Sequence, residues 1–248
     1  MRVSASIVTY NSSKEIIGIL DSLYECLNVG LDDVYLIDNN STDNTISIVK
    51  NNYSWVKLIE SNTNLGYGAG HNKAIQSIES DIHFIINPDI ILNKEEFKKM
   101  INYMNFNSSV AIVSPKVLNS DGSVQYLPKK NPKLKYLLGS SNRLKMFREE
   151  YTMQNIEITN PVDIEFCSGC FMICRTKFLK LCGGFDDRYF LYFEDADLSR
   201  MLKKYGRVIY NPNFYVIHMW KRENRKSLKG IRRFIISYIK YKNKWKME

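Results

Sequence analysis

Apolar and polar stretches alternate along residues 1–90 in a repeating order of strand, turn and helix. The apolar, β-branched run at residues 3–9 predicts a strand. After a polar turn, apolar residues recur at helical spacing, at Ile16, Ile17, Ile19, Leu20, Leu23 and Leu27. Further strands are predicted at residues 34–37, 55–59 and 82–86, with helices between them. This alternation predicts an α/β fold in which a mostly parallel, Rossmann-like central sheet carries helices on both faces.

Polar residues follow three of the predicted strands, at residues 9–11, 38–43 and 87–89. In parallel sheets ligands bind beyond the carboxyl ends of the strands, so these clusters are candidate ligand contacts. Each cluster taken alone is also an ordinary turn, because Asn, Asp and Ser form turns and helix caps. The oxygen donors at residues 87–89 suit Mg²⁺ or Mn²⁺ carrying a diphosphate, since these ions take one or two carboxylates plus phosphate oxygens.

A glycine-rich turn precedes one of the predicted helices. Gly66, Gly68 and Gly70 occupy alternate positions, where the missing side chains let the backbone approach another group closely. The spacing is not that of the dinucleotide-binding fingerprint, and no Gly-Lys-Ser or Gly-Lys-Thr follows. The turn therefore supports neither a Rossmann cofactor site nor a P-loop.

Three carboxylates, Glu194, Asp195 and Asp197, fall within four positions at the start of another predicted helix. Leu198, Met201, Leu202 and Tyr205 give that helix an apolar face. Aromatic residues at 189–193 precede it, so a carboxylate there feels a helix dipole that favours its charged form and an apolar wall that opposes it. Such competition suits a general base, although an acidic pair can also serve only to charge-match a helix start.

In this order, residues 6–12, 37–43, 64–72, 87–89, 184–186 and 193–198 resemble a family 2 glycosyltransferase of the GT-A fold. The resemblance is greatest to the bacterial rhamnosyltransferase-like branch and covers roughly residues 1–240. It implies an inverting enzyme that moves a sugar, in this branch rhamnose, from a nucleotide diphosphate donor to an acceptor hydroxyl. Bacterial surface polysaccharide or another glycan is the implied product, and a glycan or lipid-linked molecule the implied acceptor.

The resemblance also implies roles for individual residues. Asp195 would be the catalytic base, and Glu194 would orient the acceptor or the loop. Asp89 stands in the family's Asp-x-Asp metal motif and, with His218, would hold Mg²⁺ or Mn²⁺; because the motif starts with Asn87, metal affinity should be lower. The implied donor-binding residues are Thr9, Tyr10, Asn11, Asp38, Asn40, Asp43, Asn64, Gly66, Gly68, Asn72 and Asn87.

Length and composition indicate one substantial core, since the chain has 248 residues and 44% apolar content. We expect a catalytic domain at residues 1–218, with a nucleotide-sugar half at about 1–115 and an acceptor half at about 116–218, followed by a basic extension at 219–248. No apolar run reaches the ~18 residues of a membrane span, and the N-terminus begins as a strand rather than a signal peptide. A cytoplasmic protein, peripheral at the inner face of the membrane, is expected.

Five cysteines are an odd number for a disulfide framework. Cys167 and Cys170 have zinc-ligand spacing but lack a second such pair, so we expect them to be small buried residues lining the acceptor pocket. Residues 128–161 mix Lys, Pro, Gly, Ser and Asn with little periodicity, which predicts a mobile loop.

The C-terminal extension carries all of the net charge of +9, with eleven Lys or Arg and two Glu at residues 219–248. Its apolar residues fall on one predicted helical face, namely Leu228, Ile231, Ile235, Tyr238, Ile239 and Trp245. A basic amphipathic helix with Tyr and Trp is typical of a protein that binds an anionic membrane surface. The same face could instead pack on the catalytic domain, and the sequence leaves both alternatives open.

Two other functions share some of these features. A sugar nucleotidyltransferase has a related α/β fold but requires a basic glycine-rich triphosphate loop near the N-terminus, which residues 3–13 lack. A nucleic-acid-binding protein would explain the basic extension but not the ordered carboxylates. We therefore expect no nucleic-acid partner.

Overall fold

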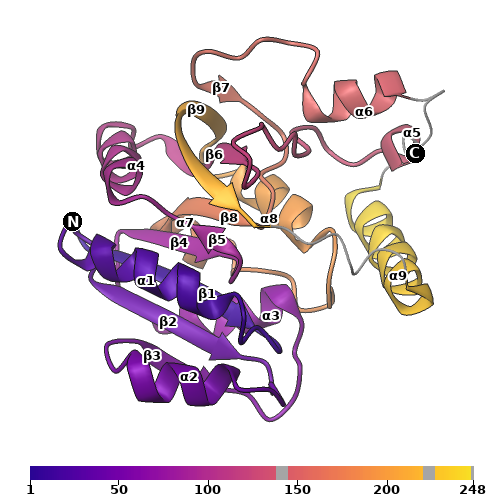
Figure 1. The fold of residues 1–248 in the computed structure, drawn as a ribbon. Helices are drawn as coiled ribbons and strands as arrows, with labels where there is room; N and C mark the ends of the chain where they lie inside the picture. The colour runs from indigo at the N-terminus through magenta and orange to yellow at the C-terminus, as the bar shows by residue number, and fades with distance from the viewer. Residues whose placement is uncertain (138–144, 220–226, 247–248) are drawn as a thin grey trace.

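A mixed nine-stranded sheet forms the centre of the protein (Figure 1) within residues 1–137, 145–219 and 227–246, which the computed structural model describes. The main path of the sheet runs in the order β3-β2-β1-β4-β8-β6-β9-β5, and β7 also pairs with β9. β1, β2, β3 and β4 are parallel, whereas β8 runs antiparallel to both β4 and β6. The strands are β1 (Val3–Thr9), β2 (Asp33–Asp38), β3 (Lys57–Glu60), β4 (Ile82–Ile86), β5 (Ile90–Ile91), β6 (Val110–Leu118), β7 (Val162–Asp163), β8 (Phe171–Arg175) and β9 (Arg207–His218).

Helices cover both faces of the sheet, and β1 and β4 are therefore buried along their whole length. α1, α2 and α4 contribute to the core on one face, and α3, α7 and α8 pack on the other. The helices are α1 (Ile16–Leu27), α2 (Thr45–Asn52), α3 (Tyr67–Ile75), α4 (Lys94–Phe106), α5 (Leu134–Leu137), α6 (Lys145–Thr152), α7 (Thr176–Leu181), α8 (Glu194–Leu202) and α9 (Leu228–Trp245). The predicted α/β fold is confirmed.

Several predicted boundaries differ from the observed ones. The third strand begins at Lys57 rather than at residue 55, because Val56 donates its N–H to the Tyr53 carbonyl in a turn. α3 begins at Tyr67, so Gly68 and Gly70 lie inside the helix and not before it. The helix predicted to include Tyr205 ends at Leu202, and Tyr205 is exposed.

The expectation of a loop throughout residues 128–161 is wrong at residues 134–137 and 145–152, where α5 and α6 lie. Glu150 of α6 accepts hydrogen bonds from Lys135 and from the Tyr136 hydroxyl of α5, the latter at 2.7 Å. These contacts between the two helices supply the order that local periodicity did not indicate. Residues 138–144 of the segment lie outside the described part of the chain.

α9 packs one face against the protein through Phe234, Tyr238, Tyr241 and Trp245. Tyr238 and Trp245 pack on the protein, whereas Ile231 and Ile235, predicted on the same helical face, are exposed. At 100° per residue the predicted face spans about 120° of the helix. One side of this face contacts the protein and the other side is exposed. Among the described residues, no helix combines the length and the low polarity that crossing a membrane requires.

Candidate active site

The carboxyl ends of β1 and β2 hold two of the predicted donor-binding residues together. Thr9 and Asp38 are register partners, and the Thr9 hydroxyl donates to Asp38 Oδ1 at 3.2 Å. Asp38 Oδ2 accepts the N–H of Ser41 at 2.8 Å. Both side chains are buried, so the carboxylate fixes the loop after β2 and keeps its position at the edge of the sheet.

Two left-handed asparagines, Asn11 and Asn40, shape the rim of this edge, with φ angles of 53° and 66°. Asn11 Oδ1 accepts the N–H of Thr42 at 2.8 Å, which joins the loops after β1 and β2. Asp43 accepts the N–H of Ser13 at 3.1 Å across the same junction. Tyr10, Asn11, Asn40 and Asp43 are exposed, so the rim presents an aromatic ring and amide groups to solvent. Residues held in uncommon backbone conformations cluster at functional sites, which supports this rim as a binding surface.

The glycine-rich segment approaches another part of the protein chain closely. Gly66 has a φ of 90°, and a Cβ there would overlap the Phe190 carbonyl oxygen, which also accepts the Tyr67 N–H at 3.0 Å. A Cβ at Gly68 would lie 2.7 Å from the Phe185 side chain. Asn64 Oδ1 accepts the Gly66 N–H at 3.0 Å and holds the turn. The close approach at Gly66 and Gly68 is therefore to residues 185–190, which lead to the acidic cluster, whereas a Cβ at Gly70 would lie 2.8 Å from Val8 of β1.

Asn72 clamps the same loop from α3. Its side-chain amide donates to the Phe185 carbonyl at 2.8 Å and its Oδ1 accepts the Phe185 N–H at 2.9 Å. Asn72 is buried, and it also donates to Asp187 at 2.6 Å. These bonds give Asn72 a role in positioning the acidic loop, whereas its predicted contact with the donor stays a prediction.

Substituting Gly66 by Ala should destabilise the protein more than its backbone conformation alone requires. Gly122 also has a positive φ, 81°, and no atom of the described residues lies within 4 Å of the place its Cβ would take, so Gly122→Ala is the reference for a positive-φ glycine without a packing conflict, at about 1–2 kcal/mol. Gly66→Ala should cost at least about 2 kcal/mol more, because a φ of 90° with a ψ of −178° is open essentially to glycine alone and the added Cβ overlaps Phe190. Thermal unfolding of the two variants measures the difference, and equal melting temperatures would contradict the packing.

The acidic cluster begins after two consecutive left-handed residues, Tyr192 and Phe193, with φ angles of 72° and 67°. Asp195 is half-buried in the first turn of α8, and its Oδ2 accepts the Gly169 N–H at 3.0 Å while its Oδ1 accepts the Ala196 N–H at 2.9 Å. These two donors orient the carboxylate. A half-buried, oriented carboxylate can reach an incoming hydroxyl, which is the geometric requirement for a general base.

Glu194 lies beside Asp195 but is almost fully buried, with 4% of its surface exposed. Burial, together with the charge of Asp195, raises the pKa of Glu194 well above its ordinary value. Its Oε2 makes no hydrogen bond within the described part of the chain. The two carboxylates therefore differ in environment, and Asp195 is the one that reaches toward solvent.

Asp89 and His218 form a second polar pair at the same edge of the sheet. Ile90 of β5 is the register partner of His218 in β9, which brings His218 Nε2 to 3.2 Å from Asp89 Oδ1. His218 Nδ1 lies 2.7 Å from Gln125 Oε1, so Gln125 sets the orientation of the ring. Both members of the pair are largely shielded from water.

This pair fits a hard divalent cation that carries a diphosphate. One carboxylate oxygen and one imidazole nitrogen can ligate a single ion, and phosphate oxygens and water complete the shell. Among the described residues, no group of three His, Cys, Asp or Glu side chains gathers at one point. The protein would therefore supply two strong ligands, and affinity would depend on the bound diphosphate.

Residues 167–170 connect Asp195 to the segment that leads to Asp89. Ser199 of α8 accepts the Cys167 N–H at 3.0 Å, Gly169 bonds to Asp195, and the Cys170 carbonyl accepts the Asn87 N–H at 3.0 Å. Burial, with a contribution from the charges of Asp89 and Asp195, raises the pKa of Cys170 to about 12. A buried neutral thiol is a poor zinc ligand, so the segment positions the two halves of the site instead.

Sequence reasoning missed three groups that build the site: Gln125, Gly169 and the Tyr67 hydroxyl, which donates to the Gly169 carbonyl. Gln125 lies in a segment with no periodic signal. Gly169 lies between Cys167 and Cys170, and the spacing of the two cysteines was interpreted without regard to the glycine between them. A Cβ at Gly169 would lie 3.3 Å from the Asp195 Cβ, which is why a glycine stands there.

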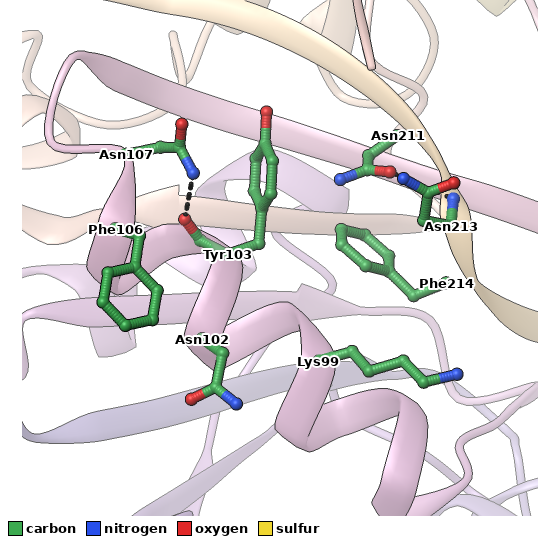
Figure 2. A pocket seen from close by; sticks show the side chains of 8 residues that line it. All are labelled: Lys99, Asn102, Tyr103, Phe106, Asn107, Asn211, Asn213 and Phe214. Atoms are coloured by element: carbon green, nitrogen blue, oxygen red, sulfur yellow. Dashed lines mark hydrogen bonds between the residues drawn. The ribbon is translucent and has the colours of Figure 1, made fainter. Parts of the chain in front are cut away.

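A cavity of about 380 Å³ lies elsewhere, between α4 and β9 (Figure 2). Its lining is mostly asparagine and aromatic, and its one charged group, Lys99, pairs with Glu96 at 2.6 Å. None of the predicted site residues lines it. The cavity is therefore separate from the candidate site.

Comparison with known proteins assigns the chain to a family. The family model described as glycosyl transferase family 2 matches residues 4–182. An N-acetylglucosaminyl-diphospho-decaprenol L-rhamnosyltransferase of Mycobacterium tuberculosis is 27% identical over 202 residues, covering 75% of this chain and 66% of that protein. Rhamnosyltransferase WbbL of Escherichia coli is 28% identical over 174 residues, covering 64% and 63%. The chain thus spans slightly less than two thirds of the length of these relatives.

A solved structure supports the fold. GalNAc-T7, crystallised with UDP, GalNAc and Mn²⁺, superposes with a TM-score of 0.72 at 14% identity, covering 98% of this chain and 48% of that chain. This likeness confirms the expected GT-A arrangement, and the family match confirms the resemblance noted in the sequence. The chain belongs to glycosyl transferase family 2, with bacterial rhamnosyltransferases among its distant relatives.

Proposed function

We propose that the chain is an inverting, metal-dependent glycosyltransferase that moves a sugar from a nucleotide diphosphate donor to an acceptor hydroxyl. The observation that carries the proposal is the link through residues 167–170: the Gly169 N–H donates to Asp195, and the Cys170 carbonyl accepts the N–H of Asn87, two residues before Asp89. A single displacement at an anomeric carbon requires a base on one side and charge neutralisation of the leaving group on the other.

In this proposal Asp195 takes the proton from the acceptor hydroxyl as its oxygen attacks the anomeric carbon. The Gly169 and Ala196 N–H groups keep the carboxylate oriented during the transfer. Thr9 and Asp38 would support the exposed rim that holds the nucleoside, formed by Tyr10, Asn11, Asn40 and Asp43. Asp89 and His218, oriented by Gln125, would hold Mg²⁺ or Mn²⁺, which neutralises the diphosphate that leaves.

The donor and the acceptor are proposed from the relatives. Rhamnose is the donor sugar to test first, because the two curated relatives described above are named as rhamnosyltransferases. The decaprenol in the name of the mycobacterial relative supports a lipid-linked acceptor in polysaccharide synthesis. Residues 1–115 would serve the donor and residues 116–218 the acceptor. A cytoplasmic site of action, at the inner face of the membrane, agrees with the five free cysteines.

A screen of nucleotide sugars tests the proposal. Purified protein with Mn²⁺ is mixed with each donor, and the released nucleoside diphosphate is measured with and without acceptor. The proposal expects release from at least one donor, stimulated by an acceptor and lost in Asp195→Asn. Pyrophosphate released from a nucleoside triphosphate and a sugar phosphate would instead identify a nucleotidyltransferase.

A further inference from the structure

α9 carries a second face that is apolar and exposed. Leu228 is 87% exposed, Ile231 46%, Ile235 51%, Ile236 41% and Ile239 51%. The sequence spacing of Leu228, Ile231, Ile235 and Ile239 aligns them along one stripe of the helix. α9, yellow in Figure 1, lies along the outside of the protein, so the stripe faces away from the sheet. Isolated exposed apolar residues are normal, but five on one helix mark an interaction surface.

The charges of α9 identify the chemistry of the partner. The helix contains six Lys or Arg and no Asp or Glu. Three of the six contact the protein: Arg233 lies 4.1 Å from the centre of the Phe190 ring, Lys240 donates to the Arg188 carbonyl, and Lys244 pairs with Asp197 at 2.7 Å. The other three, Lys229, Arg232 and Lys242, are exposed. Lys229 and Arg232 lie among the first residues of the stripe, and Lys242 lies one turn beyond its last, Ile239. An aliphatic stripe with exposed cations toward both ends complements an anionic lipid surface.

The opposite face ties α9 to the loop that carries the base. The Phe193 ring packs on Phe234 at 4.9 Å between ring centres. Ser237 donates its hydroxyl to the Leu191 carbonyl at 2.8 Å. These contacts hold residues 189–193, directly before Glu194 and Asp195, against the helix.

Asp197 anchors the end of the helix. This fully buried carboxylate accepts hydrogen bonds from the Lys244 ammonium and the Trp245 indole N–H, both at 2.7 Å. Lys244 also pairs with Asp186 at 2.9 Å. Because removing one partner of a buried charge pair is costly, α9 and α8 are expected to move as one unit.

We propose that the stripe formed by Leu228, Ile231, Ile235, Ile236 and Ile239 inserts into the surface of an anionic bilayer. Lys229, Arg232 and Lys242 contact the lipid headgroups. Since the other face of α9 grips the loop before Asp195, docking brings the base to the membrane surface. That the acceptor is lipid-linked rests on the proposed function, but the binding of the helix to lipid does not.

Sedimentation with vesicles of phosphatidylglycerol and phosphatidylcholine tests the surface without any sugar donor. The intact chain should bind these vesicles, bind more weakly as salt increases, and bind phosphatidylcholine vesicles weakly. The double variant Ile235→Gln with Ile239→Gln should lose binding by roughly tenfold or more, since two aliphatic side chains no longer leave water. The matched control is Ile17→Gln with Leu181→Gln, at residues 44% and 63% exposed on α1 and α7, and it should bind like the intact chain.

Two further measurements keep the test decisive. The melting temperature of the stripe variant should equal that of the control. If the stripe variant melts at a lower temperature, the triple variant Lys229→Gln, Arg232→Gln and Lys242→Gln is used in its place. This triple variant should bind anionic vesicles more weakly and with a smaller dependence on salt. Equal loss of binding in stripe and control variants, or an intact chain that does not sediment with anionic vesicles, would overturn the proposal. If the intact chain forms a dimer and does not bind vesicles, and if the stripe variant is a monomer, the stripe contacts a second copy of the chain instead of lipid. The rate of sugar transfer to a soluble acceptor should be the same in the stripe variant and the intact chain. This rate distinguishes a failure of membrane docking from a failure of the proposed function.

Discussion

Replacing Asp195 by Asn should lower the rate of sugar transfer by about 10²–10⁴, with binding of the donor little changed. The amide keeps the shape of the carboxylate and can still accept the Gly169 N–H, so the fold should survive. What is lost is the ability to take the proton of the acceptor hydroxyl. The measurement is kcat for acceptor-dependent release of nucleoside diphosphate, together with the Kd for the nucleoside diphosphate.

Glu194→Gln is the matched control for this prediction, because it makes the same chemical change one position earlier. Glu194 is buried and its pKa is raised by that burial, so it is not placed to meet an acceptor. Its variant should retain much more activity than Asp195→Asn. An inactive Glu194→Gln beside an active Asp195→Asn would move the base to Glu194.

Asp89→Ala should lower the transfer rate by about 10² or more and weaken the response to Mn²⁺. One of the two strong protein ligands is removed, and charge stabilisation by a metal ion contributes several kcal/mol at a phosphoryl leaving group. Glu79→Ala is the control, since the Glu79 carboxylate is exposed and pairs with Arg2 at 3.8 Å, next to the start of β1. The rate is measured across a titration of Mn²⁺ and again in excess chelator.

Full activity in chelator, or equal rates for Asp89→Ala and Glu79→Ala, would contradict the metal-dependent mechanism. It would leave room for neutralisation of the diphosphate by Lys or Arg side chains. The family assignment does not depend on this outcome, because it rests on the match over residues 4–182.

Local patterns predicted the parts of the fold that depend on local interactions. β1, β4 and α1 have the ranges that apolar periodicity indicated, since each buries a continuous run or a single helical face. α8 begins with Glu194 and Asp195, as the acidic residues before its apolar positions suggested. The antiparallel placement of β8 between β4 and β6 was not predictable, because it depends on pairings between strands far apart in sequence.

The sequence indicated candidate site residues one by one but not the contacts that connect them. Asp89 and His218 are more than a hundred residues apart, and only the pairing of β5 with β9 brings them together. The glycines signalled a close approach, but not that its partner is the loop at 185–190. For α9, the sequence separated polar from apolar positions, whereas the division into an aromatic packed face and an aliphatic exposed face follows from the tertiary contacts.

The anomeric configuration of the product is the most direct test of the central claim, which is a single displacement with Asp195 as base and the diphosphate leaving on the Asp89 side. Nuclear magnetic resonance of the glycoside formed by the purified protein gives this configuration. We expect a configuration opposite to that of the donor sugar, because the acceptor oxygen attacks one face of the anomeric carbon and the diphosphate leaves from the other. A product that retains the configuration of the donor would contradict it.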